Sequence, residues 1–520
     1  MTMIEVLNTD VLVIGGGPAG CWAAWNAVAS GLDVVLLDKG YVGTSGATAA
    51  GNTTTIYSRR GTSERAASVA QRVRLGHAFA EPERVERVLD RTHENLDLLA
   101  GWGYDFPSYD DGRPYRGMLR GPDYLRFMRQ KLIKARVRIL DHHPAEELLL
   151  SDGSAAGAIA RSRRTAEALE IRAGAVVIAT GGCAFLSGAL GTNNLTGDGY
   201  LMGAEAGATL SGMEFSAQYG ISPAYSSVTK GVVYFWGTFS DEDGNILAGV
   251  GDRQSIVAEA LLRGPVYAVL DKAPPRLQEG FRRGQPNIFM PFDRLGIDPF
   301  RDRFPVTLRH EGTVRGTGGM KINDRASTTV PGLFAAGDAA TRQGMSGATT
   351  GGGGPNASWA MATGSWAGED ASKYVKSLGT HWRSRTVERV TSSPLVRTAR
   401  ENPDVHDVIE AVKRQTLPLE RGFFRSSQSL GEGSAALRDL WQDQSWRWSR
   451  SAKVREAEAL IATARWATES AILRRESRGL QRRLDYPDMN PSLARRIDSG
   501  GTDSIWSAFS SSHQSLSKAS

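Results

Sequence analysis

The chain has 520 residues, too many for one small hydrophobic core, so we expect two or three domains. Its 41% hydrophobic and 23% charged residues are typical of an ordinary soluble globular protein. No apolar run reaches the roughly 18 residues of a transmembrane helix, which predicts no membrane span. No basic segment or cleavage site precedes the first apolar run at residues 11–14, and this favours a cytoplasmic location over secretion.

The charge and the cysteine content limit the partners. Lys and Arg exceed Asp and Glu by only 62 to 56, and we expect no nucleic-acid partner. Much of the basic charge follows residue 380, where it alternates with acids and apolar positions, a pattern typical of solvated helix faces; docking of an acidic partner is the alternative. Cys21 and Cys183 cannot supply the four thiolates of an iron–sulfur cluster, so no metal is expected and any one-electron partner must be a separate protein.

Residues 10–38 predict a strand, a glycine turn, a helix and a second strand. The turn reads Gly-Gly-Gly-Pro-Ala-Gly over residues 15–20. Gly15 allows the tight turn, Gly17 lets the backbone approach a pyrophosphate, and Gly20 lets the helix pack closely on the strand. The N–H groups and positive dipole at the start of such a helix bind phosphate, so this unit predicts a dinucleotide site.

Several acidic and glycine-rich segments favour FAD as the dinucleotide. Asp38 ends the second strand, where its carboxylate can accept hydrogen bonds from the adenosine ribose. An apolar strand at residues 175–182 ends in a glycine turn, and another at residues 330–338 ends in an acid. Two strands returning to one Rossmann sheet, the last delivering a carboxylate, are how large flavoproteins hold a ribityl chain. We therefore expect Asp338 to hydrogen-bond a ribityl hydroxyl or to lie against the pyrophosphate.

A long glycine-rich segment at residues 344–358 leads into a helix from Trp359. Glycines let the backbone pass flush against a planar ring, and a helix that starts near Asn356 would point its dipole at the pyrimidine edge of a flavin. A flexible linker is the alternative interpretation.

Three further segments resemble a known family. Residues 196–199 read Thr-Gly-Asp-Gly, residues 212–215 read Gly-Met-Glu-Phe, and residues 476–487 resemble an ESRGxH…DYP signature with Gln481 in place of the histidine. Together with the dinucleotide unit, they make the chain resemble, nearly end to end, the flavoproteins of succinate dehydrogenase and fumarate reductase. L-aspartate oxidase and the α chain of adenylylsulfate reductase are relatives of the same family.

The resemblance implies an α/β fold with a Rossmann-type FAD-binding domain, an inserted α+β capping domain and a C-terminal helical domain. The expected boundaries are 1–215 and 310–380 for FAD binding, 216–309 for the cap, 381–498 for the helices and 499–520 for a disordered, serine-rich tail. Apolar residues at helical spacing over 453–475 independently predict a C-terminal helix.

The glycine turns and the resemblance together predict the FAD-binding residues, and FAD is expected to be held without a covalent bond. Gly46 falls at or next to the position of the histidine that succinate dehydrogenases bond to the flavin, and glycine has no nucleophile. The expected contacts are Gly15, Gly17, Pro18, Ala19, Gly20, Asp38, Lys39, Ser45, Gly46, Ala47, Ala145, Thr180, Gly181, Asp198, Asp338, Asn356 and Ala357.

Two departures from the family pattern argue against ordinary succinate, fumarate or aspartate chemistry. Thr350 falls where the dicarboxylate enzymes place an arginine, and a hydroxyl cannot form the bidentate pair of a guanidinium. The histidine of a His-Tyr-x-x-Gly-Gly segment is absent, and Arg315 lies nearest to its position. We therefore expect Arg315 to bind any substrate anion.

The resemblance also suggests catalytic residues. Arg253 lies about where the family's cap places a proton-transferring arginine, with a surface arginine as the alternative. Trp236, in the aromatic run 232–239, would stack on an aromatic or adenylate-like substrate or else belong to the core of the cap. His310 lies where the cap rejoins the FAD domain and suits either proton transfer or hinge packing. Glu214 is expected to be structural.

The favoured function is hydride transfer between a small organic substrate and flavin N5, with O2 or a separate electron carrier as the other redox partner. One alternative is a sulfur-oxyanion enzyme similar to adenylylsulfate reductase, which would need an iron–sulfur partner protein. The other is a flavin-binding scaffold without catalytic activity.

Overall fold

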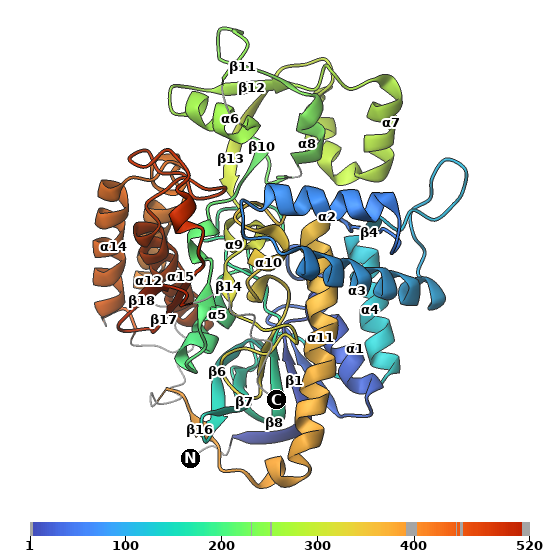
Figure 1. Ribbon diagram of the computed structural model, residues 1–520, viewed down its shortest axis with the longest axis vertical. Helices are drawn as coiled ribbons and strands as arrows, with labels where there is room; N and C mark the ends of the chain where they lie inside the picture. Colours follow the sequence, from blue (N-terminus) through green and yellow to red (C-terminus); the bar gives the residue numbers. More distant parts are fainter. Residues whose placement is uncertain are drawn as a thin grey trace.

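A twisted sheet forms the centre of the fold in the computed structural model, which describes residues 4–229, 231–249, 252–391, 403–443, 445–447 and 451–511 (Figure 1). Its strands are β1 (Glu5–Ile14), β2 (Val34–Leu37), β5 (Arg138–Leu140), β6 (Ala145–Ser151), β7 (Ser154–Arg161), β8 (Ala168–Ile178), β15 (Leu333–Ala335) and β16 (Glu388–Arg389). Their order is β16-β6-β7-β8-β1-β2-β5, with β15 paired to β8. β1 pairs in parallel with both β2 and β8, so the carboxyl ends of all three strands meet at one edge.

Helices cover this sheet, and two of them pack unusually closely. The helices are α1 (Pro18–Ala29), α2 (Ser63–Leu75), α3 (Pro82–Gly101), α4 (Gly121–Lys134), α5 (Asp198–Glu205) and α11 (Gly354–Leu378). A β-carbon added at Gly364 or Gly368 of α11 would lie 2.3 Å from a backbone oxygen of α1, so only glycine permits this approach. Because α1 and α11 both begin beside the carboxyl ends of the strands, the close packing fixes two helix N-termini relative to each other.

A second, antiparallel sheet lies at the top of Figure 1 and has its own hydrophobic cluster. Its order is β10-β13-β12-β11, with β10 (Tyr219–Pro223), β11 (Thr238–Ser240), β12 (Val266–Val269) and β13 (Phe304–His310). The helices α6 (Arg253–Leu261), α7 (Pro275–Gly284) and α8 (Pro286–Leu295) accompany it. We propose this sheet and its helices as the capping unit, although β13 ends at His310, one residue beyond the boundaries of 216–309 expected from the sequence.

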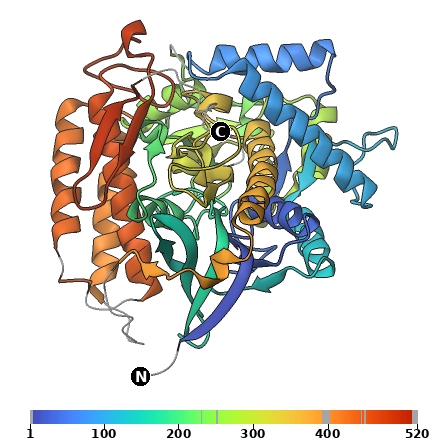
Figure 2. The same ribbon diagram turned by 60° about the horizontal axis from the view of Figure 1, so that its bottom comes forward.

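The C-terminal part is mainly helical and lies beside the central sheet (Figures 1 and 2). It contains α12 (Pro403–Thr416), α13 (Leu419–Gly422), α14 (Ser427–Gln442) and α15 (Ala452–Leu473). A third sheet, in the order β14-β9-β17-β18, joins it to the rest through β9 (Leu210–Ser211), β14 (Gly319–Met320), β17 (Ile497–Gly500) and β18 (Trp506–Phe509). Short elements complete the fold: β3 (Asn52–Thr54), β4 (Met118–Arg120), α9 (Gly312–Arg315), α10 (Gln343–Ser346) and 3-10 turns at Met213–Phe215, Gly231–Trp236, Gly337–Ala339, His381–Ser384 and Pro491–Leu493.

The expectation of a disordered tail from residue 499 is wrong for residues 499–511. The β17–β18 hairpin occupies this segment, and Figure 2 shows it lying against the C-terminal helices. The Trp466 indole donates a hydrogen bond of 2.9 Å to the carbonyl of Gly501, and Lys321 forms a 2.6 Å ion pair with Asp498. These contacts come from distant parts of the chain, so they overrode a local composition typical of disorder. Residues 512–520 lie outside the described residues.

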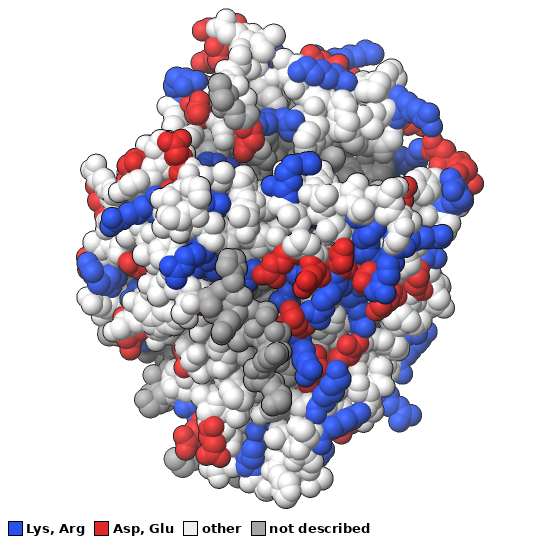
Figure 3. All heavy atoms as spheres, in the orientation of Figure 1, with Lys and Arg blue, Asp and Glu red and all other residues white. Residues whose placement is uncertain are grey.

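Charged side chains have different surroundings at the surface and in the interior. On the face shown in Figure 3, acidic and basic side chains lie next to one another over much of the surface, as the near balance of charge suggests. In the interior, Glu214 is fully buried and accepts a 2.9 Å hydrogen bond from Arg474. Burial raises the pKa of Glu214, although the Arg474 charge opposes that shift.

None of the helices in the described ranges has the length and apolar character needed to cross a bilayer.

Candidate active site

A cavity of about 800 Å³ lies between the central sheet and the capping unit. Its lining includes the carboxyl ends of β1 and β2, the first turns of α1 and α11, and residues of β10 and α6 from the cap. This volume is within the usual range for cofactor and ligand pockets. The edge where parallel strands end therefore faces a cavity large enough to hold a sizeable ligand.

The glycine turn at one end of the cavity is built as its sequence predicts. A β-carbon on Gly20 would lie 1.7 Å from the carbonyl oxygen of Gly15, while nothing lies within 4 Å of a β-carbon on Gly17. Helix α1 has no side-chain hydrogen bond at its N-terminus, so its first N–H groups can bind an anion. This end of the cavity has the features of a pyrophosphate site.

Asp38 organises the loops around this turn. Its carboxylate accepts hydrogen bonds from the backbone N–H of Gly16 at 2.8 Å, from that of Gly40 at 2.7 Å and from the Ser45 hydroxyl at 2.8 Å. Each carboxylate oxygen can accept more than one hydrogen bond, so a ribose hydroxyl can be added to this set. Asp38 therefore connects the glycine turn to the segment that carries Ser45, Gly46 and Ala47.

Every predicted FAD residue except Gly20 lines the cavity. Gly20 instead faces the Gly15 carbonyl, where the absence of a side chain permits the close packing expected from the sequence. Lys39 bridges to the opposite wall, where its ammonium donates to the Thr196 hydroxyl at 2.8 Å and to Asp198 at 2.7 Å. The structure thus brings residues from 15 to 357 around one space, although their individual contacts to FAD are proposals.

A buried ion pair lies at the wall of the cavity, which Asp338 lines. Arg342, 1% exposed, pairs with Asp338, and its Nη2 also donates to the carbonyl of Thr313 at 3.0 Å. Burial raises the pKa of Asp338 above its ordinary value, and the guanidinium charges of Arg342 and Arg315 oppose this shift. Sequence reasoning missed Arg342, whose only local signal is its position four residues after Asp338.

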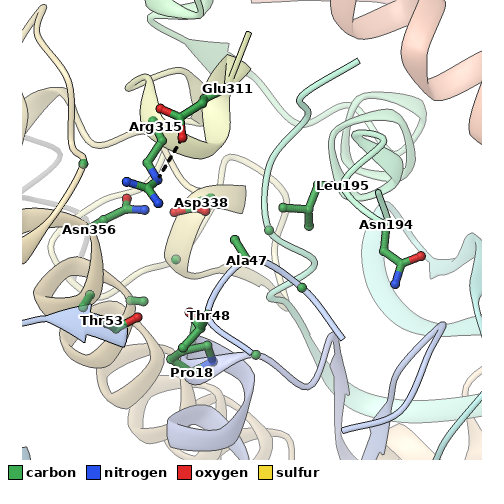
Figure 4. Close-up of a pocket in the computed structure, with 18 of the residues that line it drawn as sticks. Pro18, Ala47, Thr48, Thr53, Asn194, Leu195, Glu311, Arg315, Asp338 and Asn356 are labelled. Carbon is green, nitrogen blue, oxygen red and sulfur yellow. Dashed lines mark ion pairs between the residues drawn. The ribbon is translucent and has the colours of Figure 1, made fainter. Parts of the chain in front are cut away.

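Arg315 presents its guanidinium to the cavity, as Figure 4 shows. Its Nε lies 3.9 Å from the Glu311 carboxylate, and its side chain donates no hydrogen bond to any described residue. The backbone carbonyl of Arg315 accepts hydrogen bonds from the Thr350 hydroxyl at 3.0 Å and from Gly351 at 2.9 Å. The main chain of Arg315 is therefore fixed, while the donors of its guanidinium remain available.

Glu311 was not identified from the sequence. It directly follows β13, is only 4% exposed, and lines the cavity. Its carboxylate accepts a 2.7 Å hydrogen bond from the Thr229 hydroxyl, and a β-carbon on Gly220 would lie 2.9 Å from it. An acidic residue next to His310 at the expected end of the cap was the available signal.

Arg253 lines the cavity from the capping unit at the start of α6. Its guanidinium carbon lies 4.4 Å from the ring centroid of Phe235, within the range of a cation–π contact. Partial burial lowers the pKa of Arg253, with the Asp252 charge opposing. Asp252 caps α6 by accepting a 2.8 Å hydrogen bond from Ser255 N–H, so the helix start is what positions Arg253.

Two of the predicted catalytic residues do not reach the cavity. His310 is 4% exposed and packs between Tyr219 and Phe185, with ring centroids at 4.7 and 5.4 Å. Burial lowers the pKa of His310 to about 3, so the imidazole is neutral at ordinary pH and proton transfer by it is not supported. Hinge packing, the other interpretation, fits this environment.

The structure also corrects the prediction that Trp236 stacks on a substrate. It does not line the cavity; its ring packs edge-on against Phe281 at 5.2 Å between ring centroids. The preceding residue, Phe235, lines the cavity instead and is 67% exposed. A 3-10 turn over Gly231–Trp236 directs the two neighbouring rings differently, which the aromatic run alone could not reveal.

Comparisons with known proteins agree with this architecture. A family described as FAD binding domain matches residues 10–222. The CoM/CoB fumarate reductase of Methanothermobacter marburgensis contains a polypeptide that is 26% identical and aligns over 95% of this chain and 97% of its own length. The L-aspartate oxidase of Mycobacterium tuberculosis is 28% identical, with 95% of each chain aligned.

Solved structures share the fold over the whole chain. E. coli quinol fumarate reductase superimposes with a TM-score of 0.79 at 20% identity, covering 98% of this chain and 97% of the other. Adenylylsulfate reductase from Archaeoglobus fulgidus gives a TM-score of 0.78 at 19% identity, covering 99% and 97%. At such low identity these two matches establish the fold alone.

The Rossmann-type sheet, the pyrophosphate turn and the FAD-binding match together define an FAD-dependent oxidoreductase. The chain contains an FAD binding domain and is similar over nearly its whole length to the flavoprotein of the CoM/CoB fumarate reductase and to L-aspartate oxidase. The resemblance inferred from the sequence is thereby confirmed, and FAD is the cofactor.

Proposed function

We propose that the protein transfers hydride between a small organic acid and non-covalently bound FAD, with Arg315 as the anchor for the substrate anion. The observation that supports this most directly is the Arg315 guanidinium, which faces the cavity without donating a hydrogen bond to any described residue. A guanidinium that is partly desolvated and has free donors is a strong site for a carboxylate.

The side chains around Gly46 support non-covalent FAD. Gly46 lines the cavity between Ser45 and Ala47, and none of the three carries a histidine, cysteine or tyrosine side chain that could bond to the flavin ring. A Gly46 β-carbon would meet no atom within 4 Å, which leaves room for a ring to lie against this segment. We expect acid precipitation to release all of the yellow cofactor into the supernatant.

Bound FAD supplies a hydride acceptor or donor at N5. The residues of this chain would bind the anion through Arg315, hold a proton-transferring cap residue at Arg253, and exclude water beneath the cap. Helix α11, whose first turn lines the cavity, would stabilise negative charge on the reduced ring through its N-terminal dipole.

The substrate is proposed to differ from a dicarboxylate. By the sequence resemblance, Thr350 falls where the dicarboxylate enzymes place an arginine. Its hydroxyl is used within the loop, donating to the Arg315 carbonyl at 3.0 Å and accepting from Gly352 N–H at 3.0 Å. Electrons are proposed to pass to O2 or to a separate carrier. Cys21 and Cys183 are buried, and burial raises the pKa of each thiol to about 12, which disfavours thiolate ligation of a cluster.

Anaerobic bleaching of the flavin by candidate acids tests this function. In wild-type protein the productive acid should reduce the flavin, and R315M should weaken its apparent affinity about 100-fold, the effect of losing a charged bidentate pair. R315K should retain part of the affinity because the charge remains. The exposed Arg325 offers a control, R325M, which should behave as wild type.

Flavin that no acid, enoate or adenylylsulfate can reduce or oxidise would contradict the proposal and favour a scaffold. Formation of a sulfite adduct, with an iron–sulfur protein required for turnover, would instead favour an enzyme similar to adenylylsulfate reductase. An unchanged affinity in R315M would remove Arg315 from the site while leaving the flavin chemistry in place.

A further inference from the structure

Glu311 is a buried carboxylate that faces the substrate end of the cavity and has no role in the function proposed above. Its side chain is 6% exposed, and its partners are the Thr229 hydroxyl at 2.7 Å and, more distantly, Arg315 at 3.9 Å. Burying a carboxylate is costly unless charge and hydrogen bonds compensate it. A single neutral hydrogen bond and an ion pair beyond hydrogen-bond distance are modest compensation, so this carboxylate can accept a further donor.

The separation of Glu311 and Arg315 suggests what that donor is. The two groups place a negative and a positive charge 3.9 Å apart on one wall of the cavity, as the dashed line in Figure 4 marks. An anion that binds Arg315 must approach Glu311 and is repelled by it. A substrate that carries a cation next to its carboxylate meets attraction at both groups.

The geometry points to a 2-amino acid as the substrate, and this assignment rests on the proposed function. We propose that Arg315 binds the carboxylate of the amino acid and that Glu311 accepts a hydrogen bond from its ammonium group. Ile221, Val232 and Phe235 line the cap side of the same cavity, so the side chain of the amino acid is apolar or aromatic.

For an amino-acid substrate, Glu311 takes the place of Arg253 as the group that accepts the proton released by oxidation, because Glu311 faces the ammonium group. The ammonium group gives one proton to the Glu311 carboxylate, and the C2 hydrogen leaves with its electron pair to N5 of bound FAD. The amino acid loses two electrons and becomes a 2-imino acid, while FAD gains them. Water then hydrolyses the imino acid to a 2-oxo acid and ammonium. Dioxygen or a separate electron carrier reoxidises the flavin.

The other charged groups that line the cavity have partners of their own: Asp252 lies 3.6 Å from Arg482, and Asp38 accepts hydrogen bonds from Gly16, Gly40 and Ser45. Asp338 pairs with the buried Arg342, and Lys39 pairs with Asp198 at 2.7 Å at the opposite, adenosine end. Arg253 lies against the face of Phe235, at the cap. Glu311 and Arg315 are therefore the opposite charges available to one small head group.

Matched ligands on the FAD-loaded protein test the assignment. The panel pairs 2-amino acids, such as phenylalanine and norvaline, with their 2-hydroxy analogues and with the saturated acids that lack both groups. In wild-type protein we expect anaerobic flavin reduction by the amino acids and weak perturbation of the flavin spectrum by the saturated acids. E311Q should slow amino-acid reduction about 100-fold, the usual contribution of a positioned base.

E311Q should at the same time bind the saturated acids about 10-fold more tightly, because the repulsion by Glu311 is gone. Misfolding would weaken both kinds of ligand, so the opposite changes separate recognition from a structural role. E311D, which keeps the charge, should restore part of the amino-acid reduction. The exposed Glu279 provides the control, and E279Q should match wild type in both measurements.

Reduction by hydroxy acids or enoates but not by amino acids would overturn the assignment and leave the proposed function standing. Reduction by aspartate in preference to every apolar amino acid would overturn the apolar side-chain assignment. Equal rates of flavin reduction by amino acids in E311Q and wild-type protein would overturn the role proposed for Glu311. Absence of any redox change with every acid of the panel would instead mean failure of the proposed function itself.

Discussion

His310 shows how burial decides what a residue can do. The sequence places a histidine at the end of the cap, where its ordinary pKa would suit proton transfer. In the structure the imidazole lies among aromatic rings, and within the described chain its buried Nδ1 has no hydrogen-bond partner. The adjacent Glu311 reaches the cavity instead. Of these two neighbouring residues, His310 therefore belongs to the core and Glu311 to the site.

The lowered pKa of His310 predicts a pH dependence of stability. Burial holds its pKa at about 3 in the folded protein, below the ordinary 6.5. The unfolded chain therefore binds a proton below about pH 6.5 that the folded protein does not, and stability falls as the pH decreases towards 3. This group alone contributes a slope of about 1.4 kcal/mol per pH unit in that window.

H310Q removes the titrating group, so we expect its free energy of unfolding to decline less steeply than that of wild type between pH 6 and pH 4. Urea denaturation at several pH values measures this difference. H381Q is a suitable control, because His381 is exposed and should leave the slope unchanged. Parallel wild-type and H310Q profiles would show that His310 is protonated in the folded protein.

At the scale of elements, local patterns were readable and long-range pairings were not. The strand, turn and helix at residues 10–38 lie next to one another in the chain, so glycine spacing alone predicted the pyrophosphate end. The substrate end depends on the pairing of β10 with β13, which aligns Gly220 with Arg309 and leaves room for the Glu311 carboxylate. No local pattern specifies this pairing across 89 positions, the separation of residues 220 and 309.

Helix α15 also joins the cofactor end of the cavity through a long-range contact. Glu456 of α15 lies 3.2 Å from the Lys39 ammonium and 2.7 Å from Arg163. The charges of Asp198 and Glu456 raise the pKa of Lys39 against the opposing effect of burial. The C-terminal helical part therefore helps to position a predicted FAD-binding residue.

E456Q should weaken FAD binding about 10-fold, because Lys39 loses one of its two carboxylate partners and the wall of the adenosine end loosens. Fluorescence titration of the apoprotein with FAD measures the dissociation constant. E432Q, which disrupts an exposed ion pair on α14, is the matched control and should bind FAD like wild type. Identical affinities in both variants would show that α15 and the cofactor site are independent.

At the scale of the whole molecule, a buried network of charges lies where the C-terminal part meets the FAD-binding part. Arg474 bonds to Glu214 and Glu476, each at 2.9 Å, and Arg478 bonds to Glu476 at 2.8 Å. The side chains of Arg474, Glu214 and Glu476 are fully buried. The ESRG segment, which carried the resemblance in the sequence, is therefore part of an interface between distant parts of the chain. Glu214 and Arg474, which bond across this interface, are 260 residues apart in the sequence.

R474M should destabilise the protein by about 3–5 kcal/mol, because it leaves the buried Glu214 carboxylate without its guanidinium partner and removes one of the two guanidinium partners of Glu476. Since the network lies apart from the cavity, the variant should still bind FAD, and saturating FAD should raise its melting temperature by shifting the unfolding equilibrium. Differential scanning calorimetry with and without FAD measures both effects. R475M changes the exposed neighbour and should remain within about 0.5 kcal/mol of wild type. A small loss in R474M would mean that packing, and not paired charge, holds the C-terminal part in place.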